Sequence, residues 1–283
     1  MSAEAMQTAA SFVQQLAGDL NNDNLELPMF PDSVIRIQQV FQAEEVDVDE
    51  VVRIISSDPA LAARVLQLSN SAAVRGTAEI VEVRQAVIRI GNKLVQSAAV
   101  AFAIRQAERN EGLSNESKKT LRNIWTESVE LASRCCVIAK RYTKLNADEA
   151  LLTGLLSVVG KLYIFMKAED LESLDYTDLE TILADWHPAI SKAIAESWNM
   201  SDEMVNALET QLEDNPEVKE APSLAEVLSA ARLFLDQDTS GEPLDASEYP
   251  LLQRLGIANH DDSAVTLAKH AEEIGGIRQG LSG

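Results

Sequence analysis

Few residues of this 283-residue chain are of the types that carry out chemistry in enzymes. It has three histidines, His187, His260 and His270, and two cysteines, which are adjacent at Cys135 and Cys136. A zinc or di-metal hydrolase needs several imidazoles or carboxylates that converge on one point, and no His-x-x-x-His or comparable spacing occurs here. The histidines by themselves therefore do not predict a metal centre.

His260-Asp261 is a His-Asp dipeptide, which can be half of a metal-binding pair. It lies in the polar stretch 259–263, just before a helical pattern that begins at Val265. Short polar side chains at such a place are typical helix caps, because they accept hydrogen bonds from the free amides of the first turn. We expect a residue of 261–263 to cap this helix, and metal binding there is the less favoured alternative.

The adjacent cysteines exclude a disulfide framework and a Cys-x-x-Cys motif, which fits a reducing cytoplasm. They end a continuous apolar helical face that includes Trp125, Leu131 and Ala132, so we expect both thiols in or beside the core. A reactive thiol is the alternative. Nucleotide-cradling glycine loops, a Walker lysine loop and the Gly-x-Ser-x-Gly elbow are all absent from the sequence.

The chain carries 45 acidic and 24 basic residues, a net charge of −21. This charge disfavours non-specific binding to nucleic acid or to anionic lipid. The acidity is mostly C-terminal, because residues 169–283 hold 25 acids against 6 bases, whereas residues 27–168 hold 16 against 18. The simplest explanation for the C-terminal acidity is a solvent-exposed acidic surface, and a docking site for a basic partner remains an alternative.

Nearly every segment repeats its apolar residues at intervals of three and four, which predicts an all-α protein. Helices are expected to begin at Asp47, at Asp58-Pro59, near Ser114 and at His187-Pro188. One buried helix is predicted over Ala150–Met166; it is too short to span a membrane and contains Lys161.

Several breaks between helices have their own signals. Gly91 is predicted to end one helix in the left-handed conformation, and Asn146 to cap the central helix. The segment 49–70 has helix-turn-helix proportions, but Arg53 and Arg64 are its only basic residues against three acids. Two packed helices are therefore expected there, and not a DNA-reading motif. The N-terminus shows no signal-peptide pattern.

The order of these motifs resembles the HDOD domain, the HD-related output domain of bacterial signalling proteins. The resemblance covers roughly residues 20–215 and implies an HD-like helical bundle. The residues that carry it are Leu27-Pro28-Met29-Phe30-Pro31, Ile55-Ser56-Ser57-Asp58-Pro59-Ala60-Leu61, Ser69-Asn70-Ser71, Gln85-Ala86-Val87-Ile88-Arg89-Ile90-Gly91, Trp125-Thr126-Glu127-Ser128, Gly154-Leu155-Leu156-Ser157-Val158-Val159-Gly160-Lys161-Leu162, and His187 with Trp198.

The resemblance implies three parts. An N-terminal helix over residues 1–22 precedes the HDOD domain at 23–215, and a C-terminal helical extension follows at 216–283. Within the domain, residues 23–112 correspond to the N-terminal helical half and residues 113–215 to the HD-like half.

The departures from the related HD-type phosphohydrolases concern the metal ligands. Those enzymes bind metal with a His on the first helix of the second half and with a His-Asp pair. Here the first position is Glu127 and the pair is Ser157 and Val158, while Gly160-Lys161 remain. Because valine has no donor atom and an imidazole is lost, we expect no metal, no cofactor and no catalytic residue.

The resemblance implies a candidate ligand cleft between the two halves, formed by Glu127, Ser157, Lys161 and His187. The alternative is that Glu127 and Ser157 are remnants on packed helix faces, and that His187 caps or buttresses the helix that Pro188 begins. Asp58, Asn70 and Gly91 are explained by capping and turn geometry.

The expected function is that of a cytoplasmic bacterial regulatory module that does not catalyse a reaction. It would act through a protein partner of a signalling pathway or through a small ligand, without nucleic acid or membrane, and its N-terminal helix could mediate homo-oligomerisation. Two alternatives remain: a divergent metal-dependent phosphohydrolase in which Glu127 rebuilds a metal site, and a sensor of a nucleotide second messenger.

Overall fold

The computed structural model describes most of the chain, namely residues 3–21, 25, 30–43, 45–71, 74, 79–108, 113–168, 176–213, 221–259 and 265–282. Within these ranges the secondary structure is helical, apart from a single antiparallel bridge between Leu244 and Val265. The predicted all-α fold is therefore confirmed. The dipeptide His260-Asp261 and residues 27–29 of the first HDOD-like motif lie outside the described residues.

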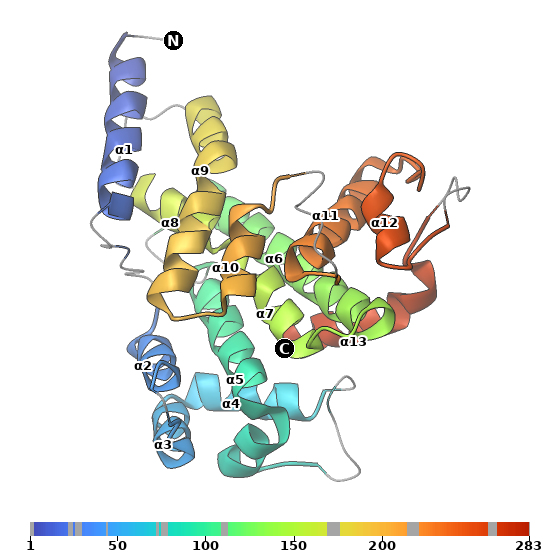
Figure 1. Cartoon of the computed structure of the whole chain (residues 1–283). Helices are drawn as coiled ribbons and strands as arrows, with labels where there is room; N and C mark the ends of the chain where they lie inside the picture. Colours follow the sequence, from blue (N-terminus) through green and yellow to red (C-terminus); the bar gives the residue numbers. More distant parts are fainter. Residues whose placement is uncertain are drawn as a thin grey trace.

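The N-terminal half consists of short helices packed on one long helix, with α1 docked on the second half (Figure 1). Asp58 caps α4 as predicted, because its carboxylate accepts from the amides of Ala60 and Leu61 at 3.1 Å. Asn70 joins the end of α4 to Ile80 through two hydrogen bonds, at 2.7 and 2.9 Å. The elements are α1 (Ala3–Asn21), α2 (Asp32–Phe41), α3 (Val48–Ser57), α4 (Pro59–Ser69) and α5 (Val83–Glu108).

The predicted break at Gly91 is present inside α5. Gly91 has φ +72° and ψ 172°, so the backbone leaves the helical region there and the segment is two helices across a kink. The φ is positive as expected, but the ψ differs from that of the left-handed helix conformation. A positive φ is strained for any residue with a side chain, which explains the glycine.

The second half is built around the long helix α6, whose closest neighbour is α7. Gly154 of α7 faces Ala132 of α6, where a Cβ atom would come within 2.5 Å of the Ala132 Cα. Only a glycine therefore permits this approach of the two helices. The elements are α6 (Asn115–Tyr142), α7 (Ala147–Leu156), α8 (Val159–Ala168), α9 (Tyr176–Ser197) and α10 (Asp202–Glu209).

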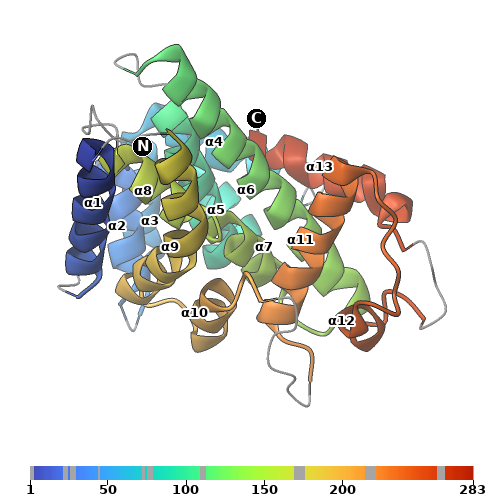
Figure 2. The same ribbon diagram turned by 90° about the horizontal axis from the view of Figure 1, so that it is seen from above.

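The C-terminal extension packs against the second half, on the opposite side of the molecule from α1 (Figure 2). Its helix α11 begins with a reciprocal capping box between Ser223 and Glu226. Both α11 and α13 contact α6, and α13 also contacts α4 and α5 of the N-terminal half. The elements are α11 (Leu224–Ser240), α12 (Pro250–Arg254), the 3-10 helix η1 (Ala268–His270) and α13 (Ala271–Ser282).

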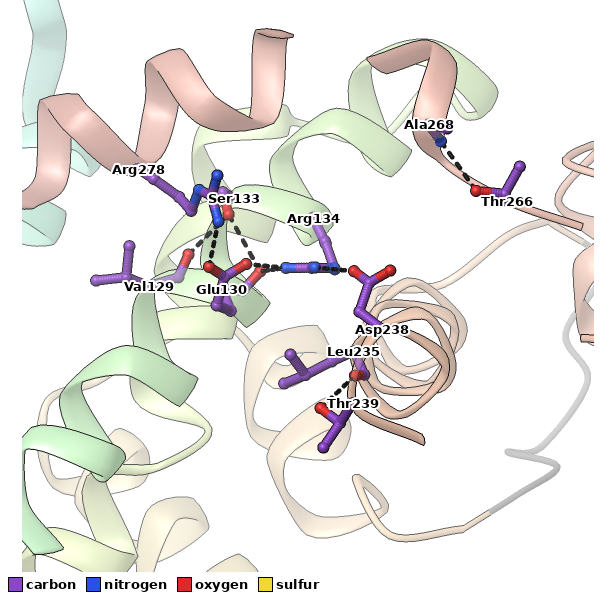
Figure 3. A network of polar contacts seen from close by, with 10 residues as sticks. All are labelled: Val129, Glu130, Ser133, Arg134, Leu235, Asp238, Thr239, Thr266, Ala268 and Arg278. Atoms are coloured by element: carbon purple, nitrogen blue, oxygen red, sulfur yellow. Dashed lines mark hydrogen bonds and ion pairs between the residues drawn. The ribbon is translucent and has the colours of Figure 1, made fainter. Parts of the chain in front are cut away.

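An ion network holds this extension on α6 (Figure 3). Arg134 of α6 is paired with Glu130 on its own helix and with Asp238 of α11. Arg278 of α13 is paired with the other oxygen of Glu130. We call these four residues, Glu130, Arg134, Asp238 and Arg278, the Arg134 network.

Three predicted element boundaries are wrong. The helix expected over Ala150–Met166 is divided into α7 and α8 by a turn at Ser157 and Val158. The helix expected to begin at His187-Pro188 begins at Tyr176, and Pro188 lies inside it. Val265 is in the bridge with Leu244, so the helix predicted from this residue begins only at Ala268.

Two segments of the described chain are long and apolar enough to cross a membrane, Val83–Ala107 and Ala147–Ala168, and the second contains the segment 150–166 that was expected to be too short. Their apolar windows are 72% and 83% buried inside the fold. Each segment is also interrupted, one at Gly91 and the other at Ser157 and Val158. The buried apolar side chains of core helices account for both segments.

Candidate functional site

Glu127 and Lys161 form an ion pair between α6 and α8. The Lys161 ammonium donates to both carboxylate oxygens of Glu127, at 2.7 and 2.8 Å. Burial raises the pKa of Glu127, but the charge and hydrogen bonds of Lys161, together with Arg232, more than offset this, so the pKa is below its ordinary value. The carboxylate is therefore ionised at neutral pH, with an ammonium group held against it.

Arg232 brings a second cation to the same carboxylate from the C-terminal extension. Its Nη1 lies 3.5 Å from Glu127 Oε1, and its Nη2 donates to Gln211. Its Nε is buried and has no hydrogen-bond partner among the described residues. The sequence analysis did not identify Arg232, because this residue lies outside the HDOD-like segment. It is the only basic residue in the sequence of α11, and this could have indicated a special role.

His187 is 2% exposed and lies in the middle of α9. Its Nδ1 is 2.8 Å from the carbonyl oxygen of Leu183. Because a carbonyl can only accept, Nδ1 carries the proton, and the neutral ring presents Nε2 as an acceptor. This Nε2 is buried without a partner. Burial and the nearby charges of Lys161 and Arg232 lower the pKa of His187 to about 4, so the ring is neutral at pH 7.

Glu127, Lys161, His187 and Arg232 line one cavity of about 340 Å³. We call it the Glu127 cavity. Its apolar wall is formed by Ile124, Leu183, Ala184 and Leu212. A volume of this size is at the lower end of the range for small-molecule sites.

The Glu127 cavity is not between the two helical halves, where the cleft was expected. Its lining residues come from α6, α8, α9, the segment after α10, and α11. It is therefore an open pocket lined by the second half and the C-terminal extension.

The structure brings three of the four predicted site residues together and leaves Ser157 apart. Ser157 is fully buried, and its hydroxyl donates to the carbonyl oxygen of Gly154 at 2.8 Å. Its own carbonyl oxygen accepts from the hydroxyl of Ser191 at 3.3 Å. Ser157 thus stabilises the turn between α7 and α8 and is not among the residues that line the cavity.

Gly160 determines how α8 lies against α9. Its amide donates to the Ser191 hydroxyl at 2.9 Å, and a Cβ atom at this position would be 2.2 Å from the carbonyl oxygen of His187. This close approach brings Lys161, the next residue, and His187 to the same cavity.

These residues do not fit a metal ion of the HD type. Glu127 is occupied by Lys161 and Arg232, the Ser157 hydroxyl is bonded to the backbone, and Val158 has no donor atom. Among the described residues, no group of three or more His, Cys, Asp or Glu side chains could hold a metal. A cation placed at Glu127 would have to displace the protein's own ammonium group.

The remaining candidate groups are explained by packing. Cys135 and Cys136 are 1% and 8% exposed, and burial raises the pKa of each thiol to about 12, so neither is a thiolate at neutral pH. His270 lies away from the cavity, with its Nε2 3.0 Å from the hydroxyl of Tyr142.

Comparisons with solved structures support the fold. A candidate metal-dependent phosphohydrolase of Shewanella amazonensis SB2B superimposes with a TM-score of 0.72 at 22% identity, over 97% of this chain and 99% of that one. An HDOD domain protein of Geobacter sulfurreducens gives a TM-score of 0.51 at 23% identity, over 99% and 89% of the two chains. A candidate signal transduction protein of Marinobacter aquaeolei VT8 gives 0.56 at 20% identity, over 97% and 66%.

A curated relative is similar in sequence as well. It is an uncharacterized protein of Treponema pallidum (strain Nichols), 24% identical over an alignment of 253 residues that covers 82% of this chain and 47% of the relative. The chain therefore spans about half the length of the curated relative that it matches.

The sequence model of the HDOD domain matches residues 27–213, which is most of the chain and includes α2 to α10. Glu127, Lys161 and His187 lie inside this match, and Arg232 lies beyond it. On this match, the chain belongs to the HDOD domain family.

Proposed function

We propose that this protein is a signalling module that binds a ligand or partner at the Glu127 cavity and does not catalyse a reaction. The observation that carries the proposal is the ion pair of Glu127 with Lys161, in which an ammonium group contacts both carboxylate oxygens. In the HD-type phosphohydrolases that the chain resembles, this helix position supplies a metal ligand. An internal cation in that place removes the need for a metal and leaves no Lewis acid to activate water.

The packing of the second half supports the proposal. Ser157 and Val158 stand where the resemblance places a His-Asp pair, and both are fully buried in the turn between α7 and α8. The helices that carried the ligands can thus persist without them. The signal-transduction description of the Marinobacter aquaeolei protein supports a signalling role, which we extend to this chain by similarity of fold.

Metal analysis and an activity panel test the proposal. The protein, purified without added metal, is analysed for iron, manganese and zinc, and is then incubated with manganese, iron or magnesium and a panel of nucleotides and cyclic dinucleotides. We expect no stoichiometric metal and no turnover. Turnover that is lost in Glu127→Gln and kept in Glu116→Gln, an exposed carboxylate on the same helix, would establish the divergent phosphohydrolase instead.

Calorimetry with the same panel of nucleotides tests the alternative that the protein is a nucleotide sensor. Saturable binding of a nucleotide without product, lost on substitution of Lys161 or Arg232, would identify the ligand as a nucleotide. It would leave the non-catalytic role intact.

A further inference from the structure

The Glu127 cavity carries an excess of buried positive charge. Its partly buried charged side chains are one carboxylate, Glu127, and two cations, Lys161 and Arg232, with 24%, 21% and 17% exposure. Two further carboxylates face this group from α9 and α11, Glu180 at the cavity and Asp236 one turn after Arg232, and both are exposed to solvent, which screens them. The two cations of the cavity therefore outnumber its one partly buried carboxylate, and Asp236 offsets part of this excess through its interaction with Arg232.

Two buried polar atoms of the cavity residues have no partner among the described residues. Arg232 Nε is a donor, and Nε2 of the neutral His187 is an acceptor. A buried polar atom without a hydrogen bond destabilises the folded state, so such atoms are rare in folded proteins. One ligand that satisfies both atoms would explain why they are retained.

We propose that the Glu127 cavity binds a small monocarboxylic acid with an apolar body, whose carboxylate contacts Arg232 and shares one proton with His187. The inference rests on the proposed function and specifies its ligand. The apolar body would lie against Ile124, Leu183, Ala184 and Leu212.

A monocarboxylate fits the lining of the cavity better than a phosphate does. It carries its charged group at one end and a hydrocarbon body at the other, and the cavity places Arg232 and His187 beside an apolar wall. The apolar wall also favours a ligand with a hydrocarbon body over inorganic phosphate or a nucleotide phosphate.

Binding should take up one proton from solvent. In the free protein burial, together with the charges of Lys161 and Arg232, lowers the pKa of His187 and keeps the ring neutral. A bound carboxylate offsets these charges, so a proton is retained between its oxygen and His187 Nε2, while Nδ1 stays bonded to Leu183. Linkage then predicts an affinity that rises as the pH falls, by up to about tenfold per pH unit.

Calorimetry on the full chain tests the proposal with benzoate and hexanoate as probes, their neutral amides as matched controls, and inorganic phosphate as a polar anion. We expect saturable binding of the carboxylates, none of the amides or phosphate, and tighter binding at pH 5.5 than at pH 7.5. Binding of phosphate as strong as that of benzoate, binding of the amides, or an affinity independent of pH would overturn the proposal.

Three variants test whether the carboxylate binds at the Glu127 cavity. Leu212→Glu places a negative charge at an exposed lining position and should weaken carboxylate binding at least severalfold without affecting folding. Arg232→Gln should abolish binding, and His187→Asn should remove its pH dependence. Lys269→Gln, an exposed lysine of η1, should bind as the wild type does.

Different results would contradict the carboxylate ligand and the non-catalytic role. If no carboxylate binds but the protein also holds no metal and hydrolyses nothing, the ligand inference is wrong and the non-catalytic role stands. Stoichiometric metal held through Glu127 would instead overturn the proposed function.

Discussion

Two of the clusters of charged side chains on helix α6 differ in how fully their polar atoms are satisfied. The Arg134 network joins α6 to α11 and α13, and none of its side chains has a buried atom without a partner (Figure 3). The Glu127 cavity joins α6 to α8, α9 and α11, and it contains the unpartnered Arg232 Nε and His187 Nε2. The first cluster is a completed contact, and the second has unused hydrogen-bonding capacity beside an open volume.

The comparison assigns stabilisation of the fold to one cluster and ligand binding to the other, although both clusters lie on the same helix. A fully paired buried network holds elements together, and the loss of one partner leaves a buried charge. A cluster with unpaired atoms lowers stability until something binds. Both clusters use the C-terminal extension, through Asp238 in one case and Arg232 in the other. The extension thus completes the cavity as well as covering α6.

The largest effect is expected from Arg134→Ala. Arg134 is 6% exposed and pairs with Glu130 and Asp238, so its removal leaves the partly buried Glu130 with Arg278 as its remaining partner. We expect the free energy of unfolding to fall by about 3 to 4 kcal/mol, measured by urea denaturation. Carboxylate binding should persist under conditions where the variant is folded.

Arg141→Ala is the matched control, because Arg141 is an exposed arginine on the same helix that pairs with Glu273. Its effect on stability should be far smaller. Equal losses in the two variants would contradict the view that the Arg134 network holds the extension on α6.

The second effect is a pH dependence of stability caused by His187. Its pKa is lowered from 6.5 to about 4, so between these values the unfolded chain binds more protons than the folded one. Stability therefore falls as the pH drops through this window, by about 3 kcal/mol in total, and is independent of this group above pH 6.5. Urea denaturation of wild type and His187→Gln at several pH values measures it.

In His187→Gln this part of the pH dependence should be absent. His270→Gln is the control, since His270 is less buried and contacts Tyr142 away from the cavity. If removal of His270 flattened the profile as much as removal of His187, the buried neutral imidazole would not be its source.

The third effect concerns the pair of Glu127 and Lys161. Glu127→Gln and Lys161→Met should each lower the free energy of unfolding by about 1–2 kcal/mol, and the double variant by less than the sum, with a coupling of about 1 kcal/mol. Because the pKa of Glu127 is lowered from 4.5, this contribution is present above pH 4.5 and is lost as the pH falls below it. Additive losses would mean that the two groups do not stabilise each other.

The features that could be predicted from the sequence are those set by neighbouring residues. Asp58 before Pro59 and Asn146 before α7 both cap as expected, because a cap depends on a few residues of backbone. The positive φ at Gly91 was also predicted, since the chain offers glycine where the helical pattern breaks.

The features that could not be predicted depend on contacts between distant segments. The helix start expected at His187-Pro188 is wrong because α9 already begins at Tyr176, packs on α8 and continues through Pro188. The break at Ser157 accompanies the approach of Gly160 to the His187 carbonyl, which no local pattern shows. Glu127, Lys161 and His187 were found from the family resemblance, but Arg232 joins them only through folding of the extension.

The smallest effect is expected in the reactivity of the cysteines, which reports on the α6–α11 contact. Both thiols are buried, with pKa values raised to about 12, so labelling by a thiol reagent at pH 8 requires local opening of the fold. Cys135 follows Arg134 in α6, so loosening of the Arg134 network should speed its labelling. Arg134→Ala should therefore label faster than wild type, and its acceleration should exceed that of the double variant Glu127→Gln with Lys161→Met, whose expected loss of stability is smaller. Rapid labelling of the folded wild type, or equal acceleration in both variants, would show that the two clusters of α6 are not independent.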